Sequence, residues 1–168
     1  MNPAEHNEQL VFENVWGKDV SHVRTQVLNI WKQHGGPIGE KGQDRLRELL
    51  FLVKNSAGEV VGMSTAFKAY IKQLRNHFFV FRLMIVPSVR VPGLTSKLLL
   101  LTRDFLESVH TEETNDPPIG LLTLVENEEL KKFRNEAVWP ASKMVYIGNS
   151  KGGHHIRVYY FKGVRILP

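Results

Sequence analysis

The segment from Phe78 to Val109 reads FFVFRLMIVPSVRVPGLTSKLLLLTRDFLESV, and it contains a strand, a tight loop and a helix in immediate succession. Phe78–Val86 is a dense apolar run of strand length, rich in aromatic and β-branched residues. Residues 87–95 form a turn that contains prolines and a glycine. From Leu94 onward, apolar residues recur at gaps of three and four, which is the spacing of one helix face. These positions are Leu94, Leu98, Leu101, Phe105 and Val109.

A strand, a loop and a helix in this order can bind an anion. The backbone N–H groups of the loop and of the helix N-terminus point the same way, and that end carries about half a positive charge. We therefore expect a phosphorylated ligand at the turn from Arg90 to Ser96. Gly93 permits close backbone approach, and Thr95 adds a hydroxyl donor. Arg90 and Lys97 add positive charge, although Arg90 taken alone is equally well interpreted as a solvated loop charge.

Composition and length are those of an ordinary globular protein. The chain has 168 residues, of which 42% are hydrophobic and 23% charged, and this predicts one domain over residues 1–168. No run approaches the roughly 18 apolar residues of a membrane span, and the polar N-terminus does not resemble a signal peptide. The chain has no cysteine, which excludes disulfides, zinc–thiolate sites and cysteine nucleophiles. We expect a cytoplasmic protein with no membrane partner.

The net charge of +5 has two interpretations. It can serve solubility, or it can match an anionic partner such as a polyphosphate cofactor or nucleic acid. No tract of consecutive Lys or Arg and no RNA-binding signature is present, so the sequence argues against nucleic acid. The residues that would carry that alternative are Lys68, Lys72, Arg75, Arg82 and Arg90.

The remaining elements predict a layered α/β (α+β) fold. Apolar patterns and turn residues indicate strands at 10–15, 50–54, 59–70, 119–125, 144–147 and 156–161, helices at about 19–34 and 126–136, a polar loop at 38–44 and a helical turn at 45–49. The fold class is therefore a mixed, mostly antiparallel sheet of about six to seven strands with helices on both faces. The strands at 78–86 and 119–125 should be parallel neighbours. Gly62, inside a strand, indicates a bulge or a close backbone approach.

This order of elements resembles the GCN5-related N-acetyltransferase (GNAT) superfamily from about Leu50 to Phe161. The family's loop carries Arg or Gln, two residues, Gly, one residue, and then Gly or Ala. Here Val86-Pro87 is followed by Arg90-Val91-Pro92-Gly93-Leu94-Thr95, in which Thr replaces the last small residue. The family's later landmarks are matched by Asn127, Leu130, Phe133-Arg134 and Val138-Trp139.

The resemblance implies a GNAT-like domain with acetyl-CoA (coenzyme A) as co-substrate. The pyrophosphate would lie against the amides of the loop, the pantetheine arm would pair with the backbone of the preceding strand, and the side chain of Asn127 would reach the same arm. Asn127 also suits a helix N-cap, and both roles can coexist. The implied cofactor-binding residues are Met84, Ile85, Val86, Arg90, Val91, Gly93, Leu94, Thr95, Ser96 and Asn127.

Three departures from the family pattern concern the chemistry. Pro92 lacks an N–H within the phosphate loop. Arg134 stands where the family's general acid is a Tyr; Arg is a poor proton donor, but it could stabilise a leaving thiolate electrostatically or simply face solvent. No carboxylate lies between Glu59 and Asp104. His77 is then the titratable base at the head of the central strand, unless it is a plain surface histidine.

The sequence thus predicts an N-acyltransferase that moves an acetyl group from acetyl-CoA to an amine, with His77 and Arg134 as candidate catalytic residues. The acceptor would be a small-molecule or peptide amine, and a homodimer is left open. The alternative is a non-catalytic GNAT-fold binding or interaction module that has lost the usual acid and base. We expect no metal, because His154 and His155 have no third ligand near them in the sequence.

Overall fold

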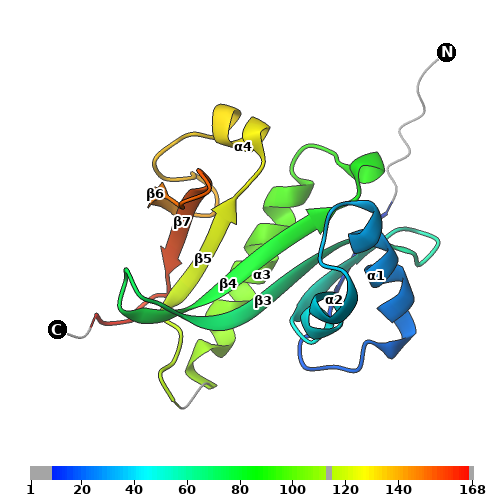
Figure 1. The fold of residues 1–168 in the computed structure, drawn as a ribbon, viewed down its shortest axis with the longest axis horizontal. Helices are drawn as coiled ribbons and strands as arrows, with labels where there is room; N and C mark the ends of the chain where they lie inside the picture. The colour runs from blue at the N-terminus through cyan, green and yellow to red at the C-terminus, as the bar shows by residue number, and fades with distance from the viewer. Residues whose placement is uncertain (1–8, 113–114, 167–168) are drawn as a thin grey trace. The chain divides into compact units, whose positions relative to one another are not determined.

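The computed structural model describes residues 9–112 and 115–166, which form a seven-stranded sheet with helices (Figure 1). The strand order is β1-β2-β3-β4-β5-β7-β6. The strands are β1 Val11–Asn14, β2 Leu49–Lys54, β3 Val60–Ile71, β4 Asn76–Ile85, β5 Gly120–Val125, β6 Val145–Asn149 and β7 His155–Tyr160. The helices are α1 Arg24–Gln33, α2 Gly39–Leu46, α3 Leu94–Val109 and α4 Glu128–Phe133, with 3₁₀ turns at Ser21–Val23, Pro87–Val89 and His110–Glu112. The predicted fold class, a mixed and mostly antiparallel sheet, is confirmed.

The predicted parallel pair is also confirmed. β4 pairs with β5 in parallel, in the register Phe79↔Leu121 and Val80↔Leu122, and α3 connects the two strands. β2 pairs with β1 and β3, and β7 pairs with β5 and β6, all antiparallel. A parallel pair needs a crossover connection, and the long Leu-rich helix provides it.

The described chain forms two compact units, which share the long strands β3 and β4. One unit comprises the described residues 9–65 and 83–92, and the other comprises residues 66–82, 93–112 and 115–166. In the first unit, α1 and α2 lie beside each other, and Arg24 on α1 donates a hydrogen bond to Gln43 on α2. Val27, Trp31 and Leu46 join one buried cluster with β2 residues Leu49 and Leu52.

One prediction for this unit was wrong. Residues 38–44 were expected to be a polar loop, but most of them belong to α2. Gly42 explains how this glycine-bearing segment packs as a helix. A Cβ at Gly42 would lie 3.0 Å from the carbonyl oxygen of Pro37 and 3.2 Å from Leu28, which is tighter than an ordinary contact, so glycine favours this close approach. Burial of Leu46 then stabilises a helix that local propensity does not favour.

Gly62 meets both expectations for a glycine inside a strand. The β2–β3 register shifts between Val53↔Gly62 and Lys54↔Val60, which marks an irregularity beside it. A Cβ at Gly62 would lie 3.1 Å from the carbonyl oxygen of Met84 and 3.2 Å from Ile85. The glycine therefore permits close contact with the end of β4 in the first unit.

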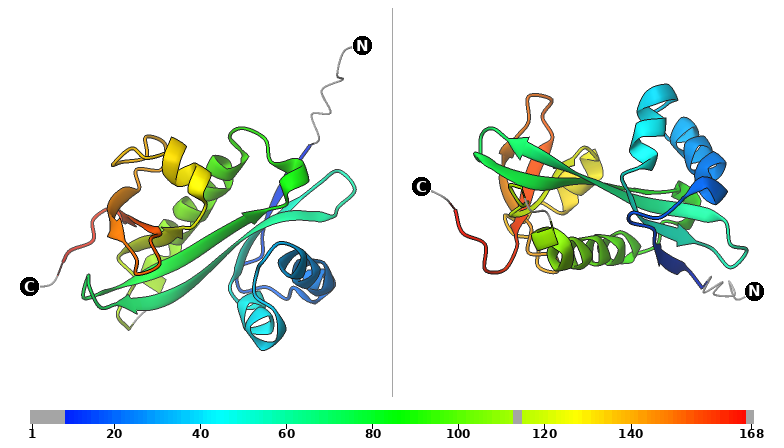
Figure 2. Two further views of the ribbon diagram at one scale, coloured as in Figure 1. Left: turned by 45° about the horizontal axis from the view of Figure 1, so that its top comes forward. Right: turned by 90° about the horizontal axis from the view of Figure 1, so that it is seen from below.

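In the second unit, α3 lies along one side of the strands (Figure 2). Its buried residues are Leu94, Leu98, Leu99, Thr102 and Leu106, which agrees with the predicted apolar face. Glu107 on α3 accepts a 3.0 Å hydrogen bond from the hydroxyl of Tyr159 on β7 and a 2.9 Å bond from the amide of Lys162. Across the described residues, no helix has the length and apolar character that crossing a membrane requires.

Candidate functional site

The N-terminal turn of α3 is a set of backbone donors for which the described residues supply no acceptor. Gly93 precedes the helix in the left-handed conformation, with φ of 84°, and its carbonyl accepts from the amide of Lys97 at 2.9 Å. No described group accepts from the amides of Leu94, Thr95 or Ser96, and no side chain caps the helix. The first amides of a helix have no intrahelical partner, so these donors can bind an anion.

Arg90 is bonded to its own segment in the first unit. Its amide donates to the carbonyl of Pro87 at 3.3 Å, and its guanidinium Nε donates to the carbonyl of Ile85 at 3.1 Å. The amide of Val86 donates to Val61 at 2.9 Å. Ile85 is buried, whereas Met84 and Val86 are half-buried and Val91 is exposed. Several backbone groups of this expected cofactor strand are thus already used within the protein.

Backbone pairing between β4 and β5 is short. In the described strands the ladder ends at Val80↔Leu122, although β5 continues to Val125. At the next position the hydroxyl of Thr123 donates to the carbonyl of Phe81 at 3.1 Å, so a side chain replaces the ladder bond. In a β–α–β unit with parallel strands, the helix N-terminus and the carboxyl end of the second strand lie at the same end. Figure 1 shows this for α3 and β5.

Asn127 lies just past that carboxyl end and caps α4. Its side-chain oxygen accepts from the amide of Leu130 at 3.1 Å, so the interpretation as an N-cap is confirmed. Its amide nitrogen has no hydrogen-bond acceptor within the described part of the chain. On the same turn, the hydrogen bond from Lys131 holds the pKa of Glu128 below its ordinary value. The side-chain oxygen of Asn127 is therefore used for capping, and its side-chain NH₂ group is available to donate to a ligand.

Arg134 ends α4, and its side chain is partly exposed. The guanidinium Nε lies 3.8 Å from a carboxylate oxygen of Glu136, and the side chain is 46% exposed. Its carbonyl accepts from the indole N–H of Trp139 at 2.8 Å and from Arg157 at 3.3 Å. The backbone of Arg134 is held by the protein, while its charge is turned to an exposed acidic neighbour.

His77 lies at the other end of the second unit from Asn127. Its carbonyl accepts from the amide of Ile119, which directly precedes β5, whereas Asn127 follows the carboxyl end of that strand. The six residues of β5 span about 20 Å. The His77 ring packs 5.2 Å from that of Tyr70. The structure therefore does not bring His77 together with Asn127.

Sequence reasoning considered His155 only as a metal ligand, which it set aside, and did not name Tyr146 as a site residue. β7 lies between β5 and β6, and this order places His155 opposite Val125, at the carboxyl end of β5. The His155 ring is 5.1 Å from the ring of Tyr146, and its Nδ1 is buried without a described hydrogen-bond partner. No local sequence signal marks this neighbourhood, because it depends on strand order. Within the described residues, no group of three His, Cys, Asp or Glu could hold a metal ion.

No family model of protein sequences and no curated protein matches this chain. Solved structures do match. An acetyltransferase of the GNAT family from Streptococcus pneumoniae superposes with a TM-score of 0.61 at 9% identity, over 91% of this chain and 99% of that one. NAA60 of Arabidopsis thaliana in complex with acetyl-CoA gives 0.61 at 12% identity, over 92% and 100%. A GNAT superfamily phosphinothricin acetyltransferase from Sinorhizobium meliloti, also with acetyl-CoA, gives 0.65 at 9% identity, over 90% and 88%. The chain therefore has the GNAT fold.

Proposed function

We propose that this protein is an acetyl-CoA-dependent N-acyltransferase acting on a small-molecule or peptide amine. The observation that carries the proposal is the uncapped first turn of α3, whose amides at Leu94, Thr95 and Ser96 have no described acceptor. It lies at the same end of its unit as the carboxyl end of β5, which Asn127 follows. Two structures with the same fold contain acetyl-CoA, which supports this cofactor class.

In the proposed reaction the neutral amine attacks the thioester carbonyl carbon. The carbon–sulfur bond breaks, the amine proton passes to a base, and coenzyme A leaves as a thiolate that takes up a proton. The α3 amides, with the hydroxyls of Thr95 and Ser96, would hold the pyrophosphate. Much of the rate acceleration would come from holding the amine and the thioester carbonyl close together in a reactive orientation. Contacts of Met84, Ile85, Val86, Arg90 and Val91 with the cofactor remain part of the proposal, although the amides of Val86 and Arg90 already donate to carbonyls of the protein.

The acid and base are proposed separately. His77 and Arg134 are the candidates that the sequence supplies, and His155 is added because its register places it beside Val125. Replacing each histidine by Gln separates them. The variant that removes a base should lower kcat and abolish the acidic limb of the pH–rate profile, whereas the other should keep both. Of the two histidines, His155 is the better candidate for the base, because it lies at the carboxyl end of β5, which Asn127 follows, whereas His77 lies at the other end of that strand.

Isothermal titration with acetyl-CoA and desulfo-CoA tests cofactor binding. Thr95→Glu places a carboxylate at the helix N-terminus, where it stabilises the helix but repels a pyrophosphate. We expect affinity to fall by at least about tenfold with no loss of thermal stability. Ser108→Glu, on an exposed position near the other end of α3, is the matched control and should bind normally. Absence of binding at millimolar ligand would remove the proposal.

A non-catalytic, CoA-binding module is the second candidate. The exposed side chain of Arg134 beside Glu136, in place of a proton donor, favours it. A thiol-detection assay with acetyl-CoA and a broad panel of amines distinguishes the two. Cofactor binding with no amine-dependent release of coenzyme A would support the binding module, and release above the hydrolysis background would support the transferase.

A further inference from the structure

One face of the sheet in the second unit is covered by α3, and the opposite face is not. Tyr159 lies on the covered face, since its hydroxyl donates to Glu107 of α3 and the guanidinium carbon of Arg103 lies 5.1 Å from the centre of its ring. Side chains alternate along a strand, so Val158 and its β5 partner Leu122 lie on the other face. Helix α4 buries none of its residues, so no described helix of this unit covers that face.

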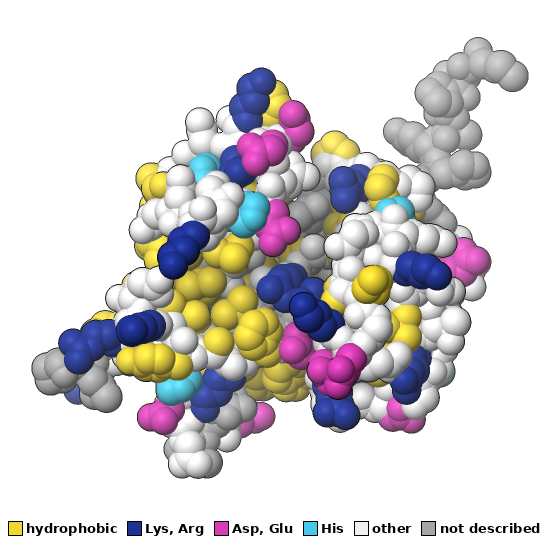
Figure 3. All heavy atoms as spheres, viewed as in Figure 1, with side chains coloured by type: hydrophobic (Ala, Val, Ile, Leu, Met, Phe, Trp, Pro, Cys, Tyr) yellow, Lys and Arg dark blue, Asp and Glu magenta, His cyan; other side chains and the backbone are white. Residues whose placement is uncertain are grey.

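This second face, which we call the open face, is apolar. Register and alternation assign to it Val80, Leu122, Leu124, Ile156, Val158 and Tyr160. Leu122 and Val158 belong to one buried cluster, and Val80 and Ile156 pack against it half-buried. Leu124 is 37% exposed and Tyr160 is 43% exposed. Figure 3 shows the apolar surface over β4, β5 and β7. Apolar area that a protein leaves uncovered is typical of a ligand or partner site.

The side chain of Arg82 lies on the open face. Arg82 follows Val80 by two residues on β4, so the two side chains share a face, whereas Phe81 between them is buried on the α3 side. Arg82 is exposed, and its guanidinium carbon lies 6.0 Å from the centre of the Phe67 ring on β3, the outer limit of a cation–π contact. The ring contact favours one orientation of the arginine, which reduces the entropy lost when a ligand binds.

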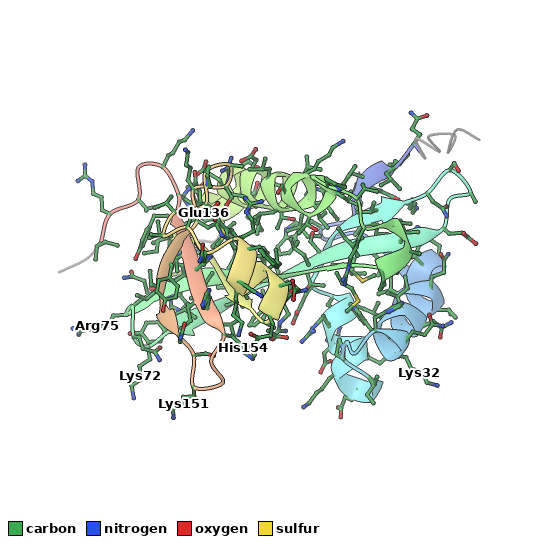
Figure 4. The ribbon with its side chains drawn as sticks, turned by 90° about the horizontal axis from the view of Figure 1, so that it is seen from above. Lys32, Lys72, Arg75, Glu136, Lys151 and His154 are labelled. Atoms are coloured by element: carbon green, nitrogen blue, oxygen red, sulfur yellow. The ribbon has the colours of Figure 1, made fainter. Side chains whose placement is uncertain are left out.

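The strands of the open face supply no carboxylate to Arg82. The sequence has no Asp or Glu from residue 60 to 103 and none in β5, β6 or β7, and Glu126 follows only past the carboxyl end of β5. Among the described residues, no ion pair joins a carboxylate to Arg82. In Figure 4, α3 lies on one side of this unit, and Lys72 and Lys151 point to the other side. The charge of Arg82 is therefore available to an anion from outside the protein.

Arg82 and Leu124 lie where β4 and β5 stop pairing. The described ladder ends at Val80↔Leu122, and Arg82 and Leu124 are the next residues of the two strands on the open face. At the position between, the hydroxyl of Thr123 takes the place of a ladder bond. Because α3 covers the other face, an amine that reaches the end of this ladder approaches over the open face, beside Arg82 and Leu124.

We propose that the acceptor is an amine that also carries a carboxylate and an apolar group, such as an apolar amino acid. This inference rests on the proposed acyl transfer. The Arg82 guanidinium would bind the carboxylate through two parallel hydrogen bonds, for which its planar fork is suited. Val80 and Leu124 would contact the apolar group, and the amine would be left free to attack the thioester. The product is the N-acetyl amino acid, whose carboxylate is unchanged. A polyamine would be repelled by Arg82.

Release of coenzyme A from acetyl-CoA, measured with matched amines, tests the acceptor class. L-phenylalanine and L-phenylalaninol differ in the carboxylate alone, and spermidine has neither a carboxylate nor an apolar ring. We expect kcat/KM for phenylalanine to exceed that for phenylalaninol by at least about tenfold, the contribution of one charge-assisted hydrogen bond. Arg82→Met should abolish this preference, chiefly by raising KM for phenylalanine, and should leave phenylalaninol nearly unchanged. Arg82→Glu should reverse the preference, because it repels the carboxylate.

Arg75→Met is the matched control, since it removes the same charge from an exposed arginine that precedes the other end of β4. It should keep the preference for phenylalanine, and thermal melting of the variants shows whether the fold is kept. Equal turnover of phenylalanine and phenylalaninol, a preference that survives Arg82→Met, or turnover of spermidine alone would overturn this acceptor class and leave the transferase standing. No amine-dependent release of coenzyme A with any of these amines would remove the proposed function together with this acceptor.

Discussion

The guanidinium carbon of Arg157 lies 4.2 Å from the centre of the Trp139 ring, and the arginine is only 1% exposed. Its terminal nitrogens donate to the carbonyls of Arg134 at 3.3 Å and Ala137 at 3.5 Å. No described carboxylate forms an ion pair with Arg157, and burial lowers its pKa. The buried Arg157 side chain on β7 therefore links the segment between α4 and β6 to the sheet through these hydrogen bonds and the ring contact.

Removing this charge should separate packing from cation–π stabilisation. Arg157→Ala leaves a cavity and two unpaired carbonyls, and we expect it to lower the free energy of unfolding by about 3 kcal/mol. Arg157→Met keeps the volume and should cost less. In a Trp139→Leu background the cost of Arg157→Met should shrink by about 1 kcal/mol, since the ring contact is already lost. Urea titrations of the four variants measure these terms, and strict additivity would exclude a cation–π contribution.

The hydroxyl of Tyr159 predicts a loss of stability in alkali. Burial, followed by the hydrogen bond to Glu107 and the charge of that carboxylate, raises the pKa of Tyr159 above its ordinary value of 10.0. A raised pKa in the folded state gives stability that is present below pH 10.0 and is lost as the pH rises through the folded-state pKa. Thermal melting above pH 10.0 should therefore show a steeper decline for the unmodified protein than for Tyr159→Phe. Tyr70→Phe, at an exposed tyrosine, is the control and should follow the unmodified protein.

Gly120 tests the register of β5 against β7. A Cβ at Gly120 would lie 2.2 Å from the carbonyl oxygen of Tyr159, a backbone atom that cannot move aside. Gly120→Ala should therefore cost about 3 kcal/mol or prevent folding. At Gly152 the nearest atom to a new Cβ is 3.4 Å away, so Gly152→Ala should change stability by less than about 0.5 kcal/mol. Equal melting temperatures for the two variants would contradict the register.

The two roles of Asn127 can be separated by substitution. Asn127→Ala removes the N-cap of α4 and should lower the free energy of unfolding by about 1 kcal/mol. Asn127→Ser keeps a capping oxygen and should preserve stability. If the side-chain amide also contacts the pantetheine arm, both variants should weaken acetyl-CoA binding in calorimetry. Normal affinity in Asn127→Ser would leave this residue with capping alone.

The sequence predicted α3 with both of its ends, because a sustained three- and four-residue spacing and a preceding glycine are local signals. It predicted the parallel β4–β5 pair for a related reason. A helix of that length brings the chain back to the starting end of β4, so the next strand runs in the same direction as β4. It missed α2, because this helix is stabilised by the packing of Gly42 and Leu46, whereas its residues have no strong local preference for a helix. It identified the loop before α3. It could not tell that the amide of Arg90 donates to the carbonyl of Pro87, whereas the amides of Leu94–Ser96 have no described acceptor.

What residue order alone determined is the central strand–loop–helix–strand unit and the resemblance to the GNAT fold, because periodicity and turn chemistry act over a few neighbouring residues. Tertiary structure alone decided that His155 adjoins Val125. This neighbourhood follows from the insertion of β7 between β5 and β6. Such pairings join segments distant in the chain, and no short stretch of sequence carries a physical signal of its partner.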